Sequence, residues 1–152
     1  MSKKLLKVQP IRNGTVIDHI KAGTGRKILD VLGLSGSATT VSLLINIVSK
    51  KQKRKDIIKI EDRELSGEEI EKLALITTNA RVNIIRNYAV ANKKKIEIPD
   101  KISGTVICQN DNCISNSERN AVTQFRLIGS DNIEIQCIYC RRKLKEEEIV
   151  FF

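Results

Sequence analysis

The sequence contains few aromatic residues, few prolines and little histidine. Of its 152 residues only 3% are aromatic, none is tryptophan, two are prolines and one is a histidine. So few rings argue against a large stacking platform for single-stranded nucleic acid, which needs aromatic faces for successive bases. Hydrophobic residues still make up 41% of the chain, so we expect a core built mainly from isoleucine, leucine and valine.

Recognisable catalytic motifs are also missing. The stretch Gly23–Lys27 lacks the Gly-Lys-Ser/Thr ending of a phosphate-binding loop, and Gly33–Ser37 lacks the second glycine of a nucleophile elbow. With a single histidine, and with the cysteines assigned to a metal below, no nucleophile–base pair can be identified. We therefore expect no enzyme activity from this chain.

The N-terminal residues show no sign of a targeting or membrane segment. The apolar stretch Leu5–Val8 is too short for the core of a signal peptide or for a spanning helix. We expect a soluble, cytoplasmic protein that does not contact membranes. Disulfides are uncommon in that compartment, except in hyperthermophiles, and the abundance of isoleucine and lysine beside scarce proline is typical of a hot-living source.

The excess of positive over negative charge lies in the first two thirds of the chain. Residues 1–100 contain 20 Lys and Arg against 11 Asp and Glu, whereas residues 101–152 contain seven of each. The N-terminal part therefore accounts for the whole net charge of +9, and any anionic ligand is expected to bind there.

Local patterns predict an alternation of strands and helices before residue 98. Ser66 and Glu69 form a capping box at the start of one helix, and Ile28, Leu29 and Leu32 have helical spacing in another. The strands are expected at residues 8–11, 16–20, 39–48, 56–61, 80–85 and 88–91.

This order predicts the α+β class. The N-terminal part is expected to be a split βαβ (ferredoxin-like) sandwich, with an antiparallel sheet and two helices on one of its faces. The lysine run Lys93–Lys95, followed by Pro99 and Asp100, marks the predicted boundary. We therefore expect a first domain at 1–98 and, at 99–152, a small all-β domain resembling a zinc ribbon.

The four cysteines have the spacing of a structural zinc site. Cys108-x4-Cys113 and Cys137-x2-Cys140 are two close pairs separated by a segment of hairpin length. A unit of about 50 residues gains much of its stability from such an ion. Four cysteines close the coordination shell, which argues against hydrolysis at the metal. Two disulfides and an iron–sulfur cluster are the alternatives, and the compartment and spacing favour zinc.

Polar residues near the strand ends of the basic part suggest a nucleotide site. Lys55 and Lys59 lie four apart on one predicted strand and so share a face. Together with Asp18 and His19 they offer ammonium groups for phosphates and a carboxylate for a ribose. From spacing alone, a non-specific basic surface is the favoured interpretation, because lysines on strands usually form a solvated face.

Several motifs together resemble the regulatory chain of aspartate carbamoyltransferase, from about Val8 to the last cysteine. They are Gly14-Thr15-Val16-Ile17-Asp18-His19-Ile20, Arg54-Lys55-Asp56-Ile57-Ile58-Lys59-Ile60-Glu61, Val82-Asn83 with Asn87-Tyr88, and Cys108-x4-Cys113-Ile114-Ser115 with Cys137-x-Tyr139-Cys140.

The resemblance implies an allosteric regulatory subunit without an active site. Chains of this family dimerise through the N-terminal domain, bind CTP and ATP there, and hold the catalytic chain through a domain containing one zinc. Two catalytic trimers and three regulatory dimers form the complex, whose catalytic chains make carbamoyl-aspartate in pyrimidine biosynthesis. A zinc-ribbon protein that binds nucleic acid is the alternative, which the neutral cysteine segment disfavours.

The resemblance also implies roles for individual residues. Asp18 and Lys59 are expected at the ribose, and Lys93 and His19 at the phosphates. The residues expected around the base are Val8, Ile11, Tyr88 and Val90, with Asn83 nearby. The first cysteine loop, through Asn110 and Asn112, is expected to lie against the catalytic chain. Pro10, which has no amide to donate, and the basic pair Arg141 and Arg142 depart from the family pattern.

Overall fold

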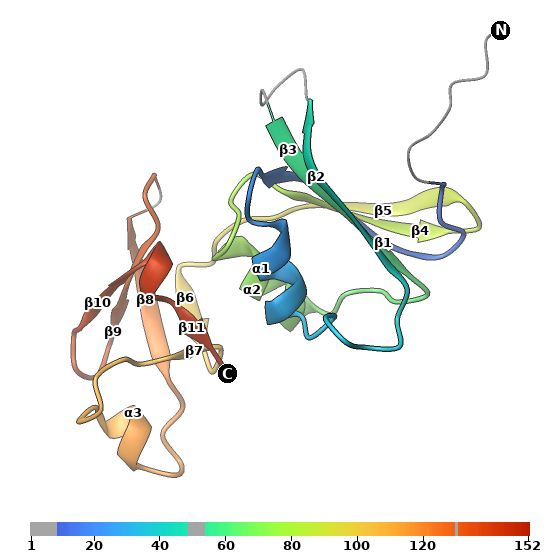
Figure 1. The fold of residues 1–152 in the computed structure, drawn as a ribbon. Coiled ribbons are helices and arrows are strands. Elements are labelled where there is room, and N and C mark those ends of the chain that lie inside the picture. Colours follow the sequence, from blue (N-terminus) through green and yellow to red (C-terminus); the bar gives the residue numbers. More distant parts are fainter. Residues whose placement is uncertain (1–8, 49–53, 130) are drawn as a thin grey trace, which may run out of the picture. The chain divides into compact units, whose positions relative to one another are not determined.

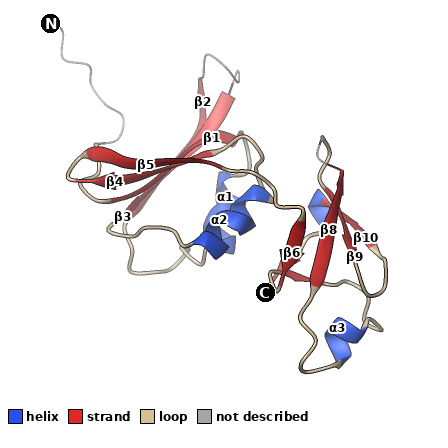
Figure 2. Cartoon of the chain, turned by 180° about the vertical axis from the view of Figure 1, so that it is seen from behind, coloured by secondary structure: helices blue, strands red, loops and turns tan. Residues whose placement is uncertain are grey.

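The computed structural model describes residues 9–48, 54–129 and 131–152, which form two compact units. The first unit comprises Met1–Ser66 and Asn79–Ile96, and the second comprises Gly67–Thr78 and Glu97–Phe152. Figure 1 shows the chain coloured along its sequence, and Figure 2 shows it from behind by secondary structure. The second unit therefore contains a segment that the sequence places between two strands of the first.

The first unit is built around one antiparallel sheet of five strands in the order β2-β3-β1-β4-β5. The strands are β1 (Gly14–Lys21), β2 (Val41–Val48), β3 (Arg54–Glu61), β4 (Arg81–Arg86) and β5 (Ala89–Lys95). Helix α1 (Gly25–Val31) connects β1 to β2, and helix α2 (Gly67–Ala74) follows β3. With β1 and β3 at the centre, this is the strand order of a split βαβ fold, and the predicted α+β class is confirmed.

Alternation of apolar and polar residues gives the sheet of the first unit a buried face and a more polar face. Ile17 on β1, Ile58 and Ile60 on β3, and Val82 on β4 are fully buried. Together with Ile28 of α1, they form the expected aliphatic core. Residues between them in sequence, such as Lys59 and Asn83, point to the other face.

Two predictions about the strands need correction. The predicted strand at residues 8–11 is wrong for its described part, because Gln9, Pro10 and Ile11 adopt no regular secondary structure. The lysine run Lys93–Lys95 forms the end of β5 and pairs with β4, so it is a strand and not a linker. The basic run Lys50–Lys55 also predicts a solvated hairpin loop, most of which lies outside the described residues.

The second unit contains a four-stranded antiparallel sheet, β10-β9-β8-β6, and a two-stranded sheet, β11-β7. The strands are β6 (Lys101–Ser103), β7 (Val106–Ile107), β8 (Gln124–Gly129), β9 (Glu134–Cys137), β10 (Lys143–Lys145) and β11 (Val150–Phe151). Two short helical turns, α3 (Ile114–Ser117) and η1 (Glu146–Glu148), complete the unit. Its core combines Phe125, Ile135 and Leu144 with the cysteines and with Leu75, which follows α2.

Candidate metal centre and effector site

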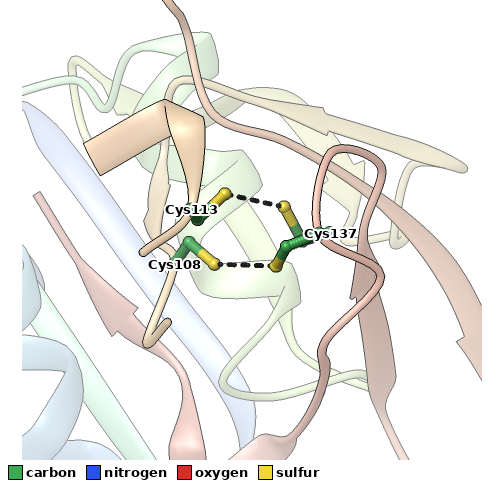
Figure 3. A group of neighbouring side chains, drawn as sticks. Cys108, Cys113 and Cys137 are labelled. Carbon is green, nitrogen blue, oxygen red and sulfur yellow. Dashed lines mark hydrogen bonds between the residues drawn. The ribbon is translucent and has the colours of Figure 1, made fainter. Parts of the chain in front are cut away.

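The four cysteines converge at one point in the second unit. Cys108 follows β7 and Cys113 precedes α3, while Cys137 ends β9 and Cys140 lies in the turn before β10. All four sulfur atoms lie within 4.8 Å of one another, and Figure 3 shows the side chains pointing toward a common centre. Spacing in the sequence therefore identified the whole cluster.

The distances between the sulfur atoms match tetrahedral coordination of one ion. The Sγ atoms of Cys108 and Cys140 are 3.6 Å apart, and those of Cys113 and Cys137 are 3.7 Å apart. Four sulfurs at about 2.3 Å from a tetrahedral zinc are separated from each other by about 3.8 Å. The thiols are free, and a donor set of four soft thiolates suits zinc or an iron–sulfur cluster.

Backbone and side-chain hydrogen bonds hold the first cysteine loop in place. The side-chain amide of Asn116 donates to the carbonyl oxygens of Cys108 and Asn110, at 2.8 and 2.7 Å. The carbonyl oxygen of Asn110 also accepts from the amide of Cys113, at 2.9 Å. Sγ of Cys113 lies 3.1 Å from the hydroxyl of Ser115. Hydrogen bonds from the protein itself, above all those of Asn116 in α3, therefore organise the loop.

The second cysteine loop reverses the chain between β9 and β10. The amide of Arg141 donates to the carbonyl of Cys137 at 2.9 Å, and the amide of Cys137 donates to the carbonyl of Arg142 at 3.0 Å. Arg141 has a φ of 64°, in the left-handed region that tight turns require. This conformation closes the Cys-x2-Cys turn and brings Cys140 back toward Cys137.

The environment shifts the thiol pKa values in opposite directions. Burial raises the pKa of Cys108 to about 12 and also raises that of Cys137, because an apolar surrounding disfavours the thiolate. Burial also opposes ionisation of Cys140. Its pKa is nevertheless lowered to about 7 by the backbone of Arg142, the side chain of Asn110 and the neighbouring thiols. Of these three thiols, Cys140 therefore ionises most easily.

The more polar face of the first unit has a cavity of about 210 Å³ among the predicted effector residues. Its lining residues are Pro10, Ile11, Val16, Lys59, Asn83, Ile85 and Tyr88. Four of these, Ile11, Lys59, Asn83 and Tyr88, are among those expected at an effector. They come from the segment before β1, from β3, from β4 and from the turn before β5, so the sheet brings together residues that are far apart in sequence.

One row of residues crosses the sheet beside this cavity. Val16 of β1 lies opposite both Lys59 of β3 and Asn83 of β4, and Asn83 lies opposite Lys93 of β5. Directly opposed residues of antiparallel strands have their side chains on the same face. We call this set the Lys59–Lys93 row. It places one lysine on each side of Val16 and Asn83.

Asp18 and His19 lie on β1, two and three residues beyond Val16. Oδ1 of Asp18 is 2.9 Å from Nζ of Lys55, and Oδ2 is 3.6 Å from Nδ1 of His19. The register of β1 against β3 shifts between Ile17 and Ile20, and His19 has a φ of 58°. Nδ1 of His19 is buried and has no hydrogen-bond partner among the described residues.

Val90 lies on β5, at the edge of the sheet, two residues after Tyr88. Tyr88 and Val90 are 68% and 47% exposed, and Val90 lies opposite Ile85, which lines the cavity. Val8 lies outside the described residues. Sequence reasoning missed Val16 and Ile85 as lining residues, although their positions in alternating strands were a usable signal. Lys55 was noted for sharing a face with Lys59, but its pairing with Asp18 was not anticipated.

Two family models match successive parts of the chain. The family model for the aspartate carbamoyltransferase regulatory chain, allosteric domain, matches residues 6–97, and that for the metal binding domain of the same chain matches residues 100–150. The chain belongs to the aspartate carbamoyltransferase regulatory chain family. The resemblance that the motifs indicated is confirmed.

Curated regulatory chains from archaea match over almost their full length. The aspartate carbamoyltransferase regulatory chain of Methanothrix thermoacetophila is 46% identical over 147 residues, covering 96% of both chains. Those of Pyrococcus horikoshii and Pyrococcus abyssi are 48% and 49% identical, covering 95% of this chain and 96% of each relative. This regulatory chain is therefore a non-catalytic, allosteric chain with a metal-binding domain that holds the four cysteines. Within its described residues, no helix has the length and apolar character needed to span a bilayer.

Proposed function

We propose that this chain is the allosteric regulatory subunit of an aspartate carbamoyltransferase of pyrimidine biosynthesis, with CTP and ATP as its effectors. The effectors bind in an N-terminal domain, residues 1–98, and a zinc domain, residues 99–152, docks on the catalytic chain. The observation that carries the proposal is the Lys59–Lys93 row beside a cavity lined by Ile11, Asn83 and Tyr88. Relatives named as regulatory chains support a catalytic-chain partner.

Each proposed effector residue has a role that its position allows. Lys59 and Asp18 hold the ribose hydroxyls, and Lys93 and His19 bind the phosphates, because ammonium groups attract the polyphosphate. The base is framed by Ile11, Tyr88, Val90 and Val8. Asn83, between Val16 and Lys93 in the row, lies near the base. Pro10 removes one backbone donor beside the base.

The metal in this proposal is one zinc per chain, held by Cys108, Cys113, Cys137 and Cys140. When bound, zinc supplies a structural cross-link between the two cysteine loops and no catalytic position, because four thiolates close its shell. Asn110 and Asn112 of the first loop face the catalytic chain. The subunits form dimers, and three such dimers join two catalytic trimers.

Two adjacent lysines provide a matched test of the effector site. Lys93 lies opposite Asn83 on the polar face, whereas Lys94 lies opposite the buried Val82 and so belongs to the other face. We expect Lys93→Ala to weaken CTP and ATP binding about tenfold to a hundredfold, the usual cost of a lost charged hydrogen bond. Lys94→Ala removes the same charge and should change affinity less than about threefold.

Isothermal titration calorimetry of the full chain with CTP and with ATP measures both variants. Absence of binding to the wild-type chain, or equal losses in the two variants, would reject the proposed site. Elemental analysis tests the metal separately. It should give one zinc per chain, and a preparation with iron or with paired disulfides would contradict the zinc assignment.

A further inference from the structure

A row of cations crosses the four-stranded sheet of the second unit. Arg126 of β8 lies opposite Lys101 of β6 on one side and Gln136 of β9 on the other, and Gln136 lies opposite Lys143 of β10. Directly opposed residues share a face, and the intervening residues Ile102, Phe125, Ile135 and Leu144 form the buried face. The three cations are exposed. We call Lys101, Arg126, Gln136 and Lys143 the cationic row.

The central guanidinium of this row is held in position. Oε1 of Gln136 accepts hydrogen bonds from Nε and Nη2 of Arg126, at 3.0 and 2.7 Å. Nε2 of Gln136 in turn donates to the carbonyl oxygen of Arg141 at 3.0 Å. Gln136 is neutral, so it orients Arg126 without offsetting its charge, and it leaves Nη1 available for a ligand.

Arg126 and Arg141 also border one cavity. A cavity of about 320 Å³ is lined by Arg126, Gln136, Cys137, Ile138 and Arg141. Within the described residues, no acidic side chain forms an ion pair with either arginine or with Lys101 or Lys143. Guanidinium groups present parallel donors that fit the two oxygens of a carboxylate, so the cavity is suited to an oxyanion.

The surroundings of the cationic row favour a short acidic segment over a long polyanion. On one side the next register position pairs Lys145 with Glu134, and Glu146–Glu148 follow directly in sequence. On the other side Ser103 and Gln124 are neutral. The cationic row is therefore one residue wide along the strands and about 14 Å long across the four strands. A nucleic-acid backbone, which needs several phosphate contacts in succession, would meet the flanking glutamates.

We propose that the cationic row and Arg141 form a docking surface for an acidic segment of the catalytic chain, with one carboxylate seated between Arg126 and Arg141. This inference rests on the proposed function, which supplies the catalytic chain as partner. It adds a contact surface separate from the first cysteine loop. The sum of charges in residues 101–152 is zero, but the fold separates the two signs and so creates a basic face on a neutral unit.

Two double variants with equal charge changes test the docking surface. Arg126→Gln with Arg141→Gln removes two charges from it, whereas Arg119→Gln with Lys145→Gln removes two exposed charges elsewhere in the same unit. We expect the first pair to weaken binding of the full chain to the purified catalytic chain about tenfold or more, and the second pair to change it less than about threefold. Arg126→Lys keeps the charge but loses the planar guanidinium group. Its affinity for the catalytic chain should lie between that of wild type and that of the first pair.

The readouts separate this inference from the function on which it rests. Binding to the catalytic chain is measured by interferometry at two salt concentrations, with zinc content and CTP affinity as folding controls that should stay at wild-type values. If wild type does not bind the catalytic chain, the proposed function fails and the inference fails with it. If wild type binds and both double variants bind equally well or equally poorly, the docking surface alone is rejected.

Two further titrations would reveal a different ligand of the docking surface. Wild type and the first pair are titrated with pyrophosphate and with a single-stranded oligonucleotide. Loss of binding to either probe in the first pair, with catalytic-chain binding unchanged, would assign the surface to a small anion or to nucleic acid and overturn the proposal. If the double variant Arg126→Gln with Arg141→Gln loses zinc or CTP affinity, the single variant Arg126→Lys is measured in its place. If Arg126→Lys then binds the catalytic chain as tightly as wild type does, the docking surface is rejected.

Discussion

Asp56 is a buried carboxylate that joins three backbone segments of the first unit. Its side chain is 1% exposed. Oδ2 accepts hydrogen bonds from the amides of Gly23 and Gly25, at 3.1 and 3.0 Å, and Oδ1 accepts one from the amide of Asn46 at 2.8 Å. All its described donors are backbone amides, so the residue holds the turn before α1 and the irregular part of β2 against β3.

Replacing Asp56 with asparagine should destabilise the first unit. In asparagine one of the two terminal atoms is a nitrogen that carries two N–H donors. That nitrogen would face a backbone N–H donor at a place where a carboxylate oxygen of Asp56 now accepts a hydrogen bond. We expect Asp56→Asn to lower the free energy of unfolding by about 2–3 kcal/mol, the cost of an unsatisfied buried group. Native-state hydrogen exchange of β1 and β3 amides measures the change, and unaltered exchange would show that the carboxylate is dispensable.

Gly14 begins β1 where a side chain has no room. Its φ is 140°, and a Cβ atom there would collide with the carbonyl oxygen of Ile60 on the neighbouring strand. Gly14→Ala should therefore push β1 from β3 and lower stability by about 2–4 kcal/mol. Gly67→Ala is the control, because a Cβ at Gly67 meets no atom within 4 Å and alanine favours a helix by up to about 1 kcal/mol. Urea denaturation measures the stability of both variants. Equal unfolding midpoints would contradict the prediction.

The two cysteine loops determine how the proposed zinc ion would compete with protons for the thiols. Burial keeps the pKa of Cys108 at about 12, whereas the pKa of Cys140 is about 7. Zinc binds thiolates and must displace every proton that the free chain still carries. Cys108 therefore releases its proton on binding throughout the neutral range, whereas Cys140 is largely ionised above pH 7.

The number of protons released on zinc binding should fall as pH rises through 7. At pH 6 Cys140 is protonated and contributes a proton, and at pH 8 it is mostly thiolate and contributes almost none. Zinc affinity itself rises with pH, because fewer protons compete. Calorimetry in buffers of different ionisation enthalpy counts the protons at each pH. Equal counts at pH 6 and pH 8 would show that the pKa of Cys140 is not lowered.

At the scale of the whole molecule, the chain passes from the first unit into the second and back. The segment Gly67–Thr78, which contains α2, belongs to the second unit, although β3 and β4 on either side of it belong to the first. Leu75, 2% exposed, is part of the core cluster that includes Phe125 and Ile135. The strands that carry Lys59 and Asn83 are therefore joined in sequence by a segment that contributes Leu75 to the core of the second unit.

Truncating Leu75 should affect the second unit selectively. Leu75→Ala removes a buried side chain from its core, and we expect a loss of about 2–4 kcal/mol. Hydrogen exchange of β8 and β9 should become faster and a chelator should remove the metal sooner, while β1 amides keep their protection. Ile28→Ala, in the core of the first unit, should give the reverse pattern. Equal effects of both variants on both units would show that the units do not unfold separately.

Much of the local architecture was predictable because it depends on short-range patterns. Local sequence patterns placed β1, β2 and β4 within a few residues, and the cysteine spacing identified the complete metal site. The strand predicted at residues 8–11 was wrong because Pro10 and Ile11 are not paired to a neighbour, which local propensity does not reveal. The continuation of β5 through Lys93–Lys95 was missed because a lysine run resembles a solvated loop, although β4 pairs with it.

The family, the four cysteines, the aliphatic core and the division of charge between the two parts of the chain follow from the order of residues alone. Which charges lie together depends on how the strands pair. Strand register places Lys93 beside Asn83 and turns Lys94 to the other face, and it aligns Lys101, Arg126 and Lys143 on a segment whose net charge is zero. The physical reason is that register joins residues far apart in the chain, and a shift of one residue would move every side chain to the opposite face.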